Sequence, residues 1–263
     1  MGDRVIQIGV LTPHVAAGPE AEFAAMAPGR LVTAVARVST ETAAASVTTG
    51  PPTPVAARAL TAPPLLDDAA ERLATGSVDV IGYASTSSAY AIGFDDEVAM
   101  ASRLSRRTGI PVAATCASAV VAVRVLDVDR IALVSPPWFD DEVNQLGAAY
   151  FRSQGVHVVS SVSADLPRDP RRIQTAAVIE WTSRHAPDDA EAVWIGGNGF
   201  RAAGAVEALE DTIGRPVLTA NQVLLWALLA HADATFEVSG YGQLFTRKPP
   251  VDLNPSTAAP PRP

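Results

Sequence analysis

Residues 78–93 read VDVIGYASTSSAYAIG, and this stretch decides how the rest of the chain is interpreted. The apolar run 78–84 predicts a buried strand, and a turn of four small hydroxyl residues follows it. These residues are Ser85, Thr86, Ser87 and Ser88. Open parallel α/β sheets bind ligands beyond the carboxyl ends of their strands, where hydroxyl and backbone N–H groups can donate to an anion. We therefore expect the turn to hold a carboxylate; the alternative is a polar loop that only caps the next helix.

Composition limits the class of protein. The chain has 263 residues, 48% of them hydrophobic, which suits two domains of ordinary size. Acidic residues outnumber basic ones, 28 to 20, so the net charge of −8 argues against a nucleic-acid partner. Cys116 is the single cysteine, which excludes an internal disulfide and a cysteine zinc cluster. The N-terminus lacks a signal-peptide pattern and no apolar run reaches membrane-spanning length, so we expect a cytoplasmic protein without a membrane partner.

Eight predicted strands alternate with helices, which is typical of parallel sheet. The strands are expected at 5–11, 31–38, 78–84, 112–114, 130–134, 156–162, 192–196 and 216–219. The helices between them are expected at 20–26, 65–74, 95–107, 119–125, 140–153, 171–185, 202–213 and 223–230, with a long loop at 39–64.

The alternation fits one closed eight-fold barrel or two open four-stranded sheets. Both halves repeat a strand, a small polar turn and a helix, and this similarity favours two open parallel four-stranded sheets flanked by helices. We expect one α/β domain from residues 1–115 and 220–246, a second from 116–219, and a disordered proline-rich tail at 247–263. GGNG at 196–199 does not fit G-x-G-x-x-G, so no nucleotide site is predicted.

Two residues are candidates for proton transfer. His14 follows the first strand and titrates near neutrality, and the alternative is an ordinary exposed loop histidine. Cys116 is expected in a strand-exit loop before a helix, where the helix N-terminus would lower its thiol pKa. The alternative for Cys116 is a small buried apolar residue.

Other polar residues fall at strand exits. Asn198 and Asn221 follow the last two strands, where side-chain amides bind carboxylates or simply form turns. Trp138 is placed to line a pocket or to join the core with Phe139. Arg37 and Arg201 are candidate carboxylate partners, with ordinary solvated arginines as the default interpretation, and no metal-ligand spacing occurs. His157, His185 and His231 are interpreted as structural.

Six segments resemble the aspartate/glutamate racemase superfamily, in its arylmalonate decarboxylase and maleate cis–trans isomerase branch. They are IGVLTP (8–13), ASTSSAYAIG (84–93), TGIPVAATCASAVVAVRVLDVDRIALVSPP (108–137), GGNG (196–199), TANQVLLW (219–226) and GYGQLF (240–245). The resemblance implies cofactor-independent chemistry in a cleft between two α/β domains, where an enediolate is stabilised beside a carboxylate. It also implies a small carboxylate substrate and a homodimer.

When the family's functional residues are matched to positions of this chain, the residues that bind a carboxylate are retained more often than those that transfer protons. Thr86 and Ser87 match hydroxyl donors of the decarboxylases, whereas Ser85 and Gly197 stand where racemases and isomerases carry catalytic cysteines. An isomerase asparagine aligns with Ala16, and Pro137 or Trp138 replaces a tyrosine. The substrate-binding candidates are Pro13, Ser88, Trp138, Gly197, Asn198 and Asn221.

The function that follows is decarboxylation of a malonate-like acid through an enediolate, because this reaction needs only one later protonation. The proton would come from His14, Cys116 or water. The alternatives are a maleate-type isomerase, a carboxylate-binding protein without catalysis, or a hydrolytic relative.

Overall fold

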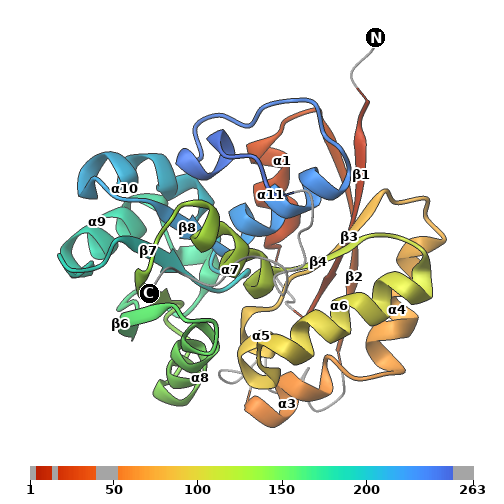
Figure 1. Cartoon of the computed structure of the whole chain (residues 1–263), viewed down its shortest axis with the longest axis horizontal. Helices are drawn as coiled ribbons and strands as arrows, with labels where there is room; N and C mark the ends of the chain where they lie inside the picture. The colour runs from red at the N-terminus through yellow and green to blue at the C-terminus, as the bar shows by residue number, and fades with distance from the viewer. Residues whose placement is uncertain (1–3, 14–16, 40–52, 251–263) are drawn as a thin grey trace.

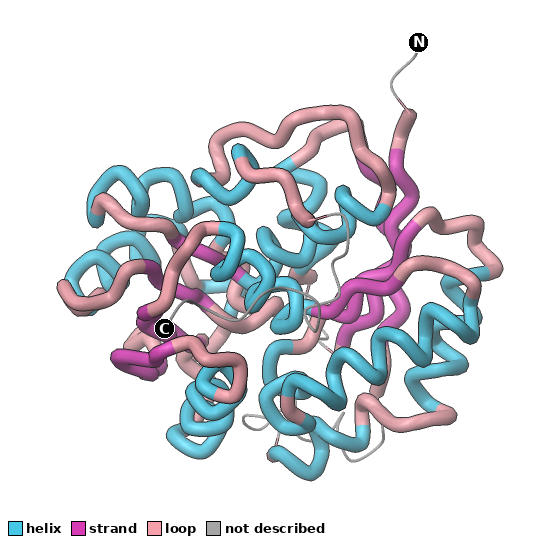
Figure 2. Tube along the Cα trace, in the orientation of Figure 1, coloured by secondary structure: helices cyan, strands magenta, loops and turns pink. Residues whose placement is uncertain are grey.

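The structure, a computed structural model, describes residues 4–13, 17–39 and 53–250. The described residues form two four-stranded parallel sheets, with a central group of helices between them (Figure 1, Figure 2). The first sheet contains β1 (Ile6–Thr12), β2 (Leu31–Arg37), β3 (Val80–Tyr83) and β4 (Val112–Ala114). The second contains β5 (Arg130–Ser135), β6 (His157–Ser163), β7 (Ala192–Ile195) and β8 (Val217–Thr219).

The two sheets are wound in the same way. Their strand orders are β2-β1-β3-β4 and β6-β5-β7-β8, so the second sheet repeats the first with each number raised by four. This confirms the predicted pair of open sheets and excludes the closed barrel. The exact domain boundaries, at residues 115/116 and 219/220, remain predictions.

Ten α-helices are described. They are α1 (Pro19–Met26), α3 (Pro54–Ala59), α4 (Leu65–Ala74), α5 (Thr86–Ile92), α6 (Phe94–Thr108), α7 (Thr115–Val125), α8 (Asp141–Arg152), α9 (Thr175–His185), α10 (Val206–Ile213) and α11 (Ala220–His231). None of these described helices is both long and apolar enough to cross a membrane.

Helices α7 and α11 fill the space between the sheets. α11 reads ANQVLLWALLAH, which is apolar on every face, and such a helix is stable only when it is surrounded by protein. It packs against α7, β3, β4 and β8, and residues 220–229 are all buried. The two sheets therefore share one continuous hydrophobic core, in which strand residues of both meet α7 and α11.

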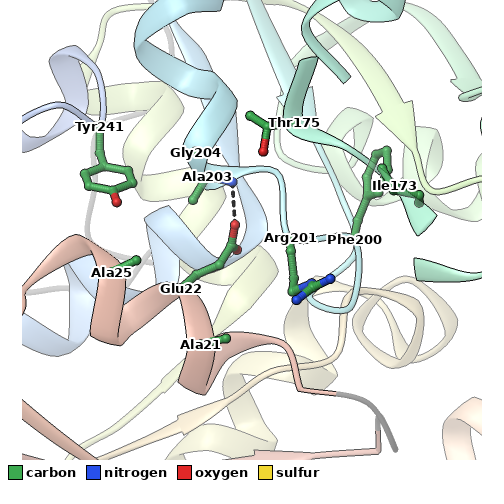
Figure 3. Close-up of a pocket in the computed structure, with 10 residues that line it drawn as sticks. All are labelled: Ala21, Glu22, Ala25, Ile173, Thr175, Phe200, Arg201, Ala203, Gly204 and Tyr241. Atoms are coloured by element: carbon green, nitrogen blue, oxygen red, sulfur yellow. Dashed lines mark hydrogen bonds between the residues drawn. The ribbon is translucent and has the colours of Figure 1, made fainter. Parts of the chain in front are cut away.

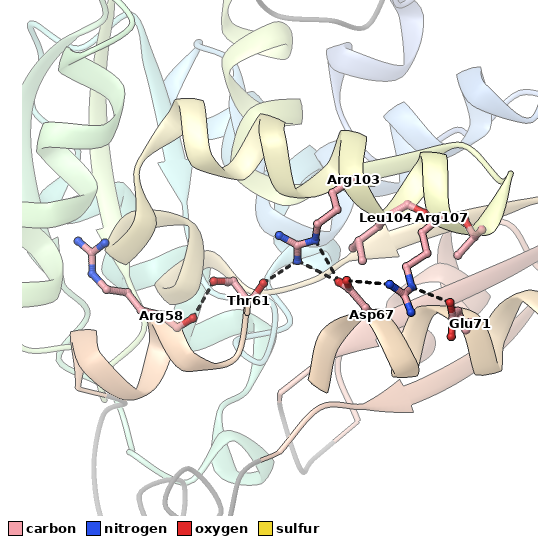
Figure 4. Close-up of polar contacts among 8 residues, drawn as sticks. Arg58, Thr61, Asp67, Glu71, Arg103, Leu104 and Arg107 are labelled. Carbon is pink, nitrogen blue, oxygen red and sulfur yellow. Dashed lines mark hydrogen bonds and ion pairs between the residues drawn. The ribbon is translucent and has the colours of Figure 1, made fainter. Parts of the chain in front are cut away.

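The outer face of the first sheet is covered by α4 and α6, which are held together by ion pairs (Figure 4). Asp67 on α4 is buried, and its Oδ1 accepts from Arg103 Nε of α6 at 3.1 Å. Arg103 Nη2 also donates to the Thr61 carbonyl at 2.9 Å, and Arg107 Nε donates to Glu71 at 2.6 Å. These charges are satisfied by one another, so we assign them to the scaffold.

The expected loop at 39–64 is partly wrong. Residues 54–59 form α3, whose N-terminus is capped by the Thr53 hydroxyl, and residues 40–52 lie outside the described part of the chain. Likewise 203–205 form a 3-10 turn before α10, and α9 begins only at Thr175. Of the predicted tail, 251–263 lie outside the described residues.

Three predicted turns are in fact first turns of helices. Residues 85–88, 115–118 and 220–222 lead directly from a strand into α5, α7 and α11. The first N–H groups of a helix have no partner within it, and polar residues at these positions can supply one. The same residue types that suggested a loop are therefore suited to a helix N-terminus.

Candidate functional site

The first turn of α5 is organised by Ser85. Ser85 Oγ accepts from the Ser88 N–H at 3.4 Å and donates to Ser88 Oγ at 2.8 Å, so Ser85 is the N-cap. Ser88 is the third residue of the helix, so within this turn the capping role belongs to Ser85. Ser87 is 6% exposed, and neither its hydroxyl nor its N–H makes a hydrogen bond to another described residue. Ser87 thus offers two donors that no described residue accepts from.

Thr86 joins the two halves of the molecule. Its N–H and its hydroxyl both donate to Asn198 Oδ1, at 3.2 and 3.1 Å. The Gly197 N–H donates to Thr86 Oγ1 at 3.0 Å. The carboxyl ends of β3 and β7 therefore meet, and the structure brings Thr86 together with Gly197 and Asn198, which lie 111 and 112 residues further along the sequence.

Asn198 continues into a buried polar chain. Its Nδ2 donates to Thr115 Oγ1 at 3.1 Å and to Asn221 Oδ1 at 2.9 Å, and all three side chains are buried. Asn221 Nδ2 donates in turn to the Asn198 carbonyl at 2.9 Å. The two asparagines bind each other in this structure, so their proposed contact with a substrate is untested.

Glu22, which the sequence interpretation missed, is the last residue of this series of buried hydrogen bonds. Its Oε2 accepts from Asn221 Nδ2 at 2.6 Å and its Oε1 from the Ala203 N–H at 2.7 Å. The carboxyl lines a pocket of about 290 Å³ beside Arg201 and Tyr241 (Figure 3). Burial raises its pKa to about 7, despite the opposing effects of the Asn221 and Ala203 hydrogen bonds. In the sequence Glu22 is one of two acids in a short helix after the first strand, and nothing there distinguishes it from Glu20.

Cys116 does not have the environment that was expected. It is fully buried in the first turn of α7, where its thiol donates to the Thr86 carbonyl at 4.0 Å. Burial, and then the nearby Glu97 carboxylate, raise the thiol pKa well above its usual range. The expected lowering of the pKa by the helix N-terminus is therefore wrong, because desolvation dominates.

The helix N-terminus is instead bound by Glu97. Glu97 Oε1 accepts from the Cys116 N–H at 3.1 Å, and Oε2 accepts from the Tyr150 hydroxyl. The carboxyl is fully buried, and this burial raises its pKa to about 7 in spite of those hydrogen bonds.

This burial predicts a pH-dependent stability. The ordinary pKa of 4.5 applies to Glu97 in the unfolded chain, so between pH 4.5 and 7 the folded protein keeps a proton that the unfolded chain releases. Stability therefore falls as pH rises through this window, by roughly 2–3 kcal/mol for this carboxyl. Urea unfolding at pH 5, 6.5 and 8 should show the decline, and Glu97→Gln should make it shallower, while the part that comes from Glu22, whose pKa burial also raises to about 7, remains. An equal slope in the two proteins would contradict the assignment.

Three further predicted residues belong to the end of the first strand and the loop after it. His14 and Ala16 fall outside the described residues, whereas Pro13 is described and half-buried directly after β1. Trp138 is half-buried and packs edge-on against Phe200, with ring centroids 6.0 Å apart.

The two arginines differ in their surroundings. Arg37 pairs with Glu20 at 2.6 Å, and Arg201 donates to the Pro170 carbonyl at 3.3 Å. In the part of the chain that the structure describes, no three His, Cys, Asp or Glu side chains are grouped to hold a metal ion.

The paired parallel sheets make this an α/β protein, and its family-model match and curated relative place it in the aspartate/glutamate racemase superfamily. The family model for arylmalonate decarboxylase matches residues 65–245, and the chain belongs to this family. The arylmalonate decarboxylase of Bordetella bronchiseptica is 24% identical over 191 residues, which cover 68% of this chain and 75% of that protein.

Solved structures agree with the fold. A crystal structure of arylmalonate decarboxylase superposes with a TM-score of 0.73 at 21% identity, over 92% of this chain and 100% of that one. The maleate isomerase from Pseudomonas putida S16, with maleate, gives 0.80 at 20% identity over 92% and 98%. A maleate cis–trans isomerase of Nocardia farcinica with a covalently bound succinylcysteine intermediate gives 0.79 at 20% identity, over the same shares.

Proposed function

We propose that this protein is a cofactor-independent decarboxylase of a malonate-like dicarboxylic acid. The observation that carries the proposal is the first turn of α5, where Ser87 has two unused donors and Thr86 directs two more toward one oxygen at the junction of the sheets. Membership of the arylmalonate decarboxylase family supports the same reaction class.

Ser87 marks where an anionic oxygen would bind. The two Thr86 donors hold Asn198 Oδ1 and so anchor the α5 turn to the second sheet. A substrate carboxylate oxygen would then accept from the Ser87 hydroxyl and N–H beside that anchor. Donors held in place in this way stabilise the charge that develops in the transition state.

The proposed reaction places the developing negative charge on the bound carboxylate. The bond between the α-carbon and the second carboxylate breaks, CO₂ leaves, and the electron pair enters the bound carboxylate as an enediolate. The α-carbon then takes one proton, which gives the monocarboxylic acid. Cys116 is the least suited donor because it is fully buried and its thiol is directed at the Thr86 carbonyl, which leaves water or His14.

Maleate isomerisation is the alternative, suggested by the isomerases that share the fold. It needs a nucleophile, and Ser85 is a poor one because its hydroxyl donates to Ser88 Oγ. A carboxylate-binding role without turnover is a further alternative. The small carboxylate partner, the cytoplasmic location, the homodimer and the absence of a cofactor belong to the same proposal.

Incubation with phenylmalonate, maleate and aspartate separates these functions. We expect phenylmalonate to be converted to the monocarboxylic acid, with one deuterium at the α-carbon when the solvent is D₂O. Fumarate from maleate would instead support the isomerase, and a thermal shift without product would support binding alone. Failure of all three acids to react or bind would overturn the proposal.

A further inference from the structure

A continuous line of buried hydrogen bonds runs from the pocket at Glu22 to the first turn of α5. Glu22 Oε2 accepts from Asn221 Nδ2, Asn221 Oδ1 accepts from Asn198 Nδ2, and Asn198 Oδ1 accepts from Thr86. The successive distances are 2.6, 2.9 and 3.1 Å. α1, α11, the loop after β7 and α5 each contribute one side chain.

All hydrogen bonds in this line run in the same donor-to-acceptor direction. Each asparagine turns its NH₂ group toward Glu22 and its oxygen toward Thr86. The Thr86 N–H can only donate, and an ionised carboxylate can only accept, so the two ends require the same direction. The Asn198 carbonyl, which accepts from Asn221 Nδ2, supports it from the side.

We propose that Glu22 is a positioning residue whose carboxylate fixes the direction of the two amides and so holds the α5 turn that carries Ser87. This inference rests on the proposed function. If Asn198 turned its NH₂ group toward Thr86, two donors would face each other, and the turn would lose its anchor to the second sheet. Donors that are misplaced by even 1 Å can lose about 100-fold in rate.

Replacement of Glu22 by glutamine tests this direction without a change of shape. Both contacts of the carboxyl are donors, Asn221 Nδ2 and the Ala203 N–H. A glutamine has one acceptor and one NH₂ group, so it must place a donor against one of them. In Glu22→Gln/Asn221→Asp the carboxylate moves one position along this line of hydrogen bonds, where it can accept both from the introduced glutamine and from Asn198 Nδ2. The variant loses the bond that Asn221 Nδ2 donates to the Asn198 carbonyl, so the recovery is expected to be partial.

Protonation of the Glu22 carboxylate should have the same effect as Glu22→Gln, because both place a donor where the carboxylate has only acceptors. Arg201 and Tyr241 are the charged and titratable side chains that line the pocket with Glu22, and Asn221 and Ala203 carry no charge. With a pKa of about 7, Glu22 gains its acceptor-only form as pH rises through neutrality. The kcat of the wild-type protein should therefore rise through this range.

The experiment compares kcat and KM for phenylmalonate between pH 5.5 and 8.5. We expect Glu22→Gln to lower kcat by about tenfold or more, with a smaller change in KM, and to remove the rise near pH 7. The double variant Glu22→Gln/Asn221→Asp should recover part of kcat. Glu180→Gln, an exposed carboxylate on α9 paired with Arg184, is the matched control and should behave as wild type.

A second readout does not depend on turnover. The ¹H–¹⁵N resonance of the Thr86 amide, which donates to Asn198 Oδ1, should shift with pH near 7 in the wild type and not in Glu22→Gln. If this titration occurs but no acid is converted, the positioning role stands and the proposed function fails. If acids are converted and Glu22→Gln keeps the wild-type kcat, pH profile and Thr86 resonance, the positioning role is overturned.

Discussion

Ser87→Ala is expected to lower kcat for phenylmalonate by about 100-fold or more while leaving the melting temperature unchanged. One preorganised donor to a developing oxyanion contributes about 3 kcal/mol to the barrier. The Ser87 hydroxyl has no hydrogen bond to another described residue, so its removal costs the fold little. Steady-state kinetics and thermal unfolding of the same preparation check both halves of this expectation.

Two variants serve as controls for Ser87→Ala. Thr86→Val keeps the shape of the side chain but removes the hydroxyl between Asn198 and Gly197, so it should lower both kcat and stability. Ser153→Ala removes a hydroxyl that donates to the Tyr150 carbonyl at the end of α8, so kcat should not change. Full activity of Ser87→Ala would remove the central donor from the proposed mechanism.

Gly197→Cys should destabilise the protein strongly, by about 2–4 kcal/mol. The resemblance assigns the second catalytic cysteine of the racemases and isomerases to this position. Here, however, Gly197 has φ of +88°, and a Cβ atom would lie 2.7 Å from Pro136 Cγ. The strain comes from both the backbone and a rigid proline ring, so the cysteine cannot be introduced alone. Urea unfolding measures the loss.

Matched substitutions separate the two sources of strain. At Gly204 a Cβ atom would have its nearest neighbour, Thr175 Cγ2, at 3.8 Å, so Gly204→Ala should be tolerated. Pro136→Ala combined with Gly197→Cys should recover the part of the loss that comes from the clash and leave the part that comes from φ. A stable Gly197→Cys protein would show that the β7–α10 loop can rearrange.

The repeated strand and helix pattern was sufficient to predict the fold. Runs such as 80–84 and 192–196 are apolar throughout, as is typical of parallel strands buried on both faces, and helices separate them. Residues 65–74 were predicted as a helix with the bounds that α4 has, because its acidic start and apolar spacing are local signals. Strand-to-helix junctions were missed at 85–88, 115–118 and 220–222, because small polar residues favour both turns and helix starts.

By itself, the sequence determined the paired open sheets and the group of hydroxyl residues at 85–88, since periodicity and composition are local properties of the chain. It did not determine that these residues form the first turn of a helix. Only the tertiary structure decided the partners of that turn. Asn198, Asn221 and Glu22 are far from Thr86 in sequence, and packing of α11 between the sheets brings them into one buried line. Burial also raised the pKa values of Cys116 and Glu97, because the cost of desolvating a charge depends on the whole surrounding fold.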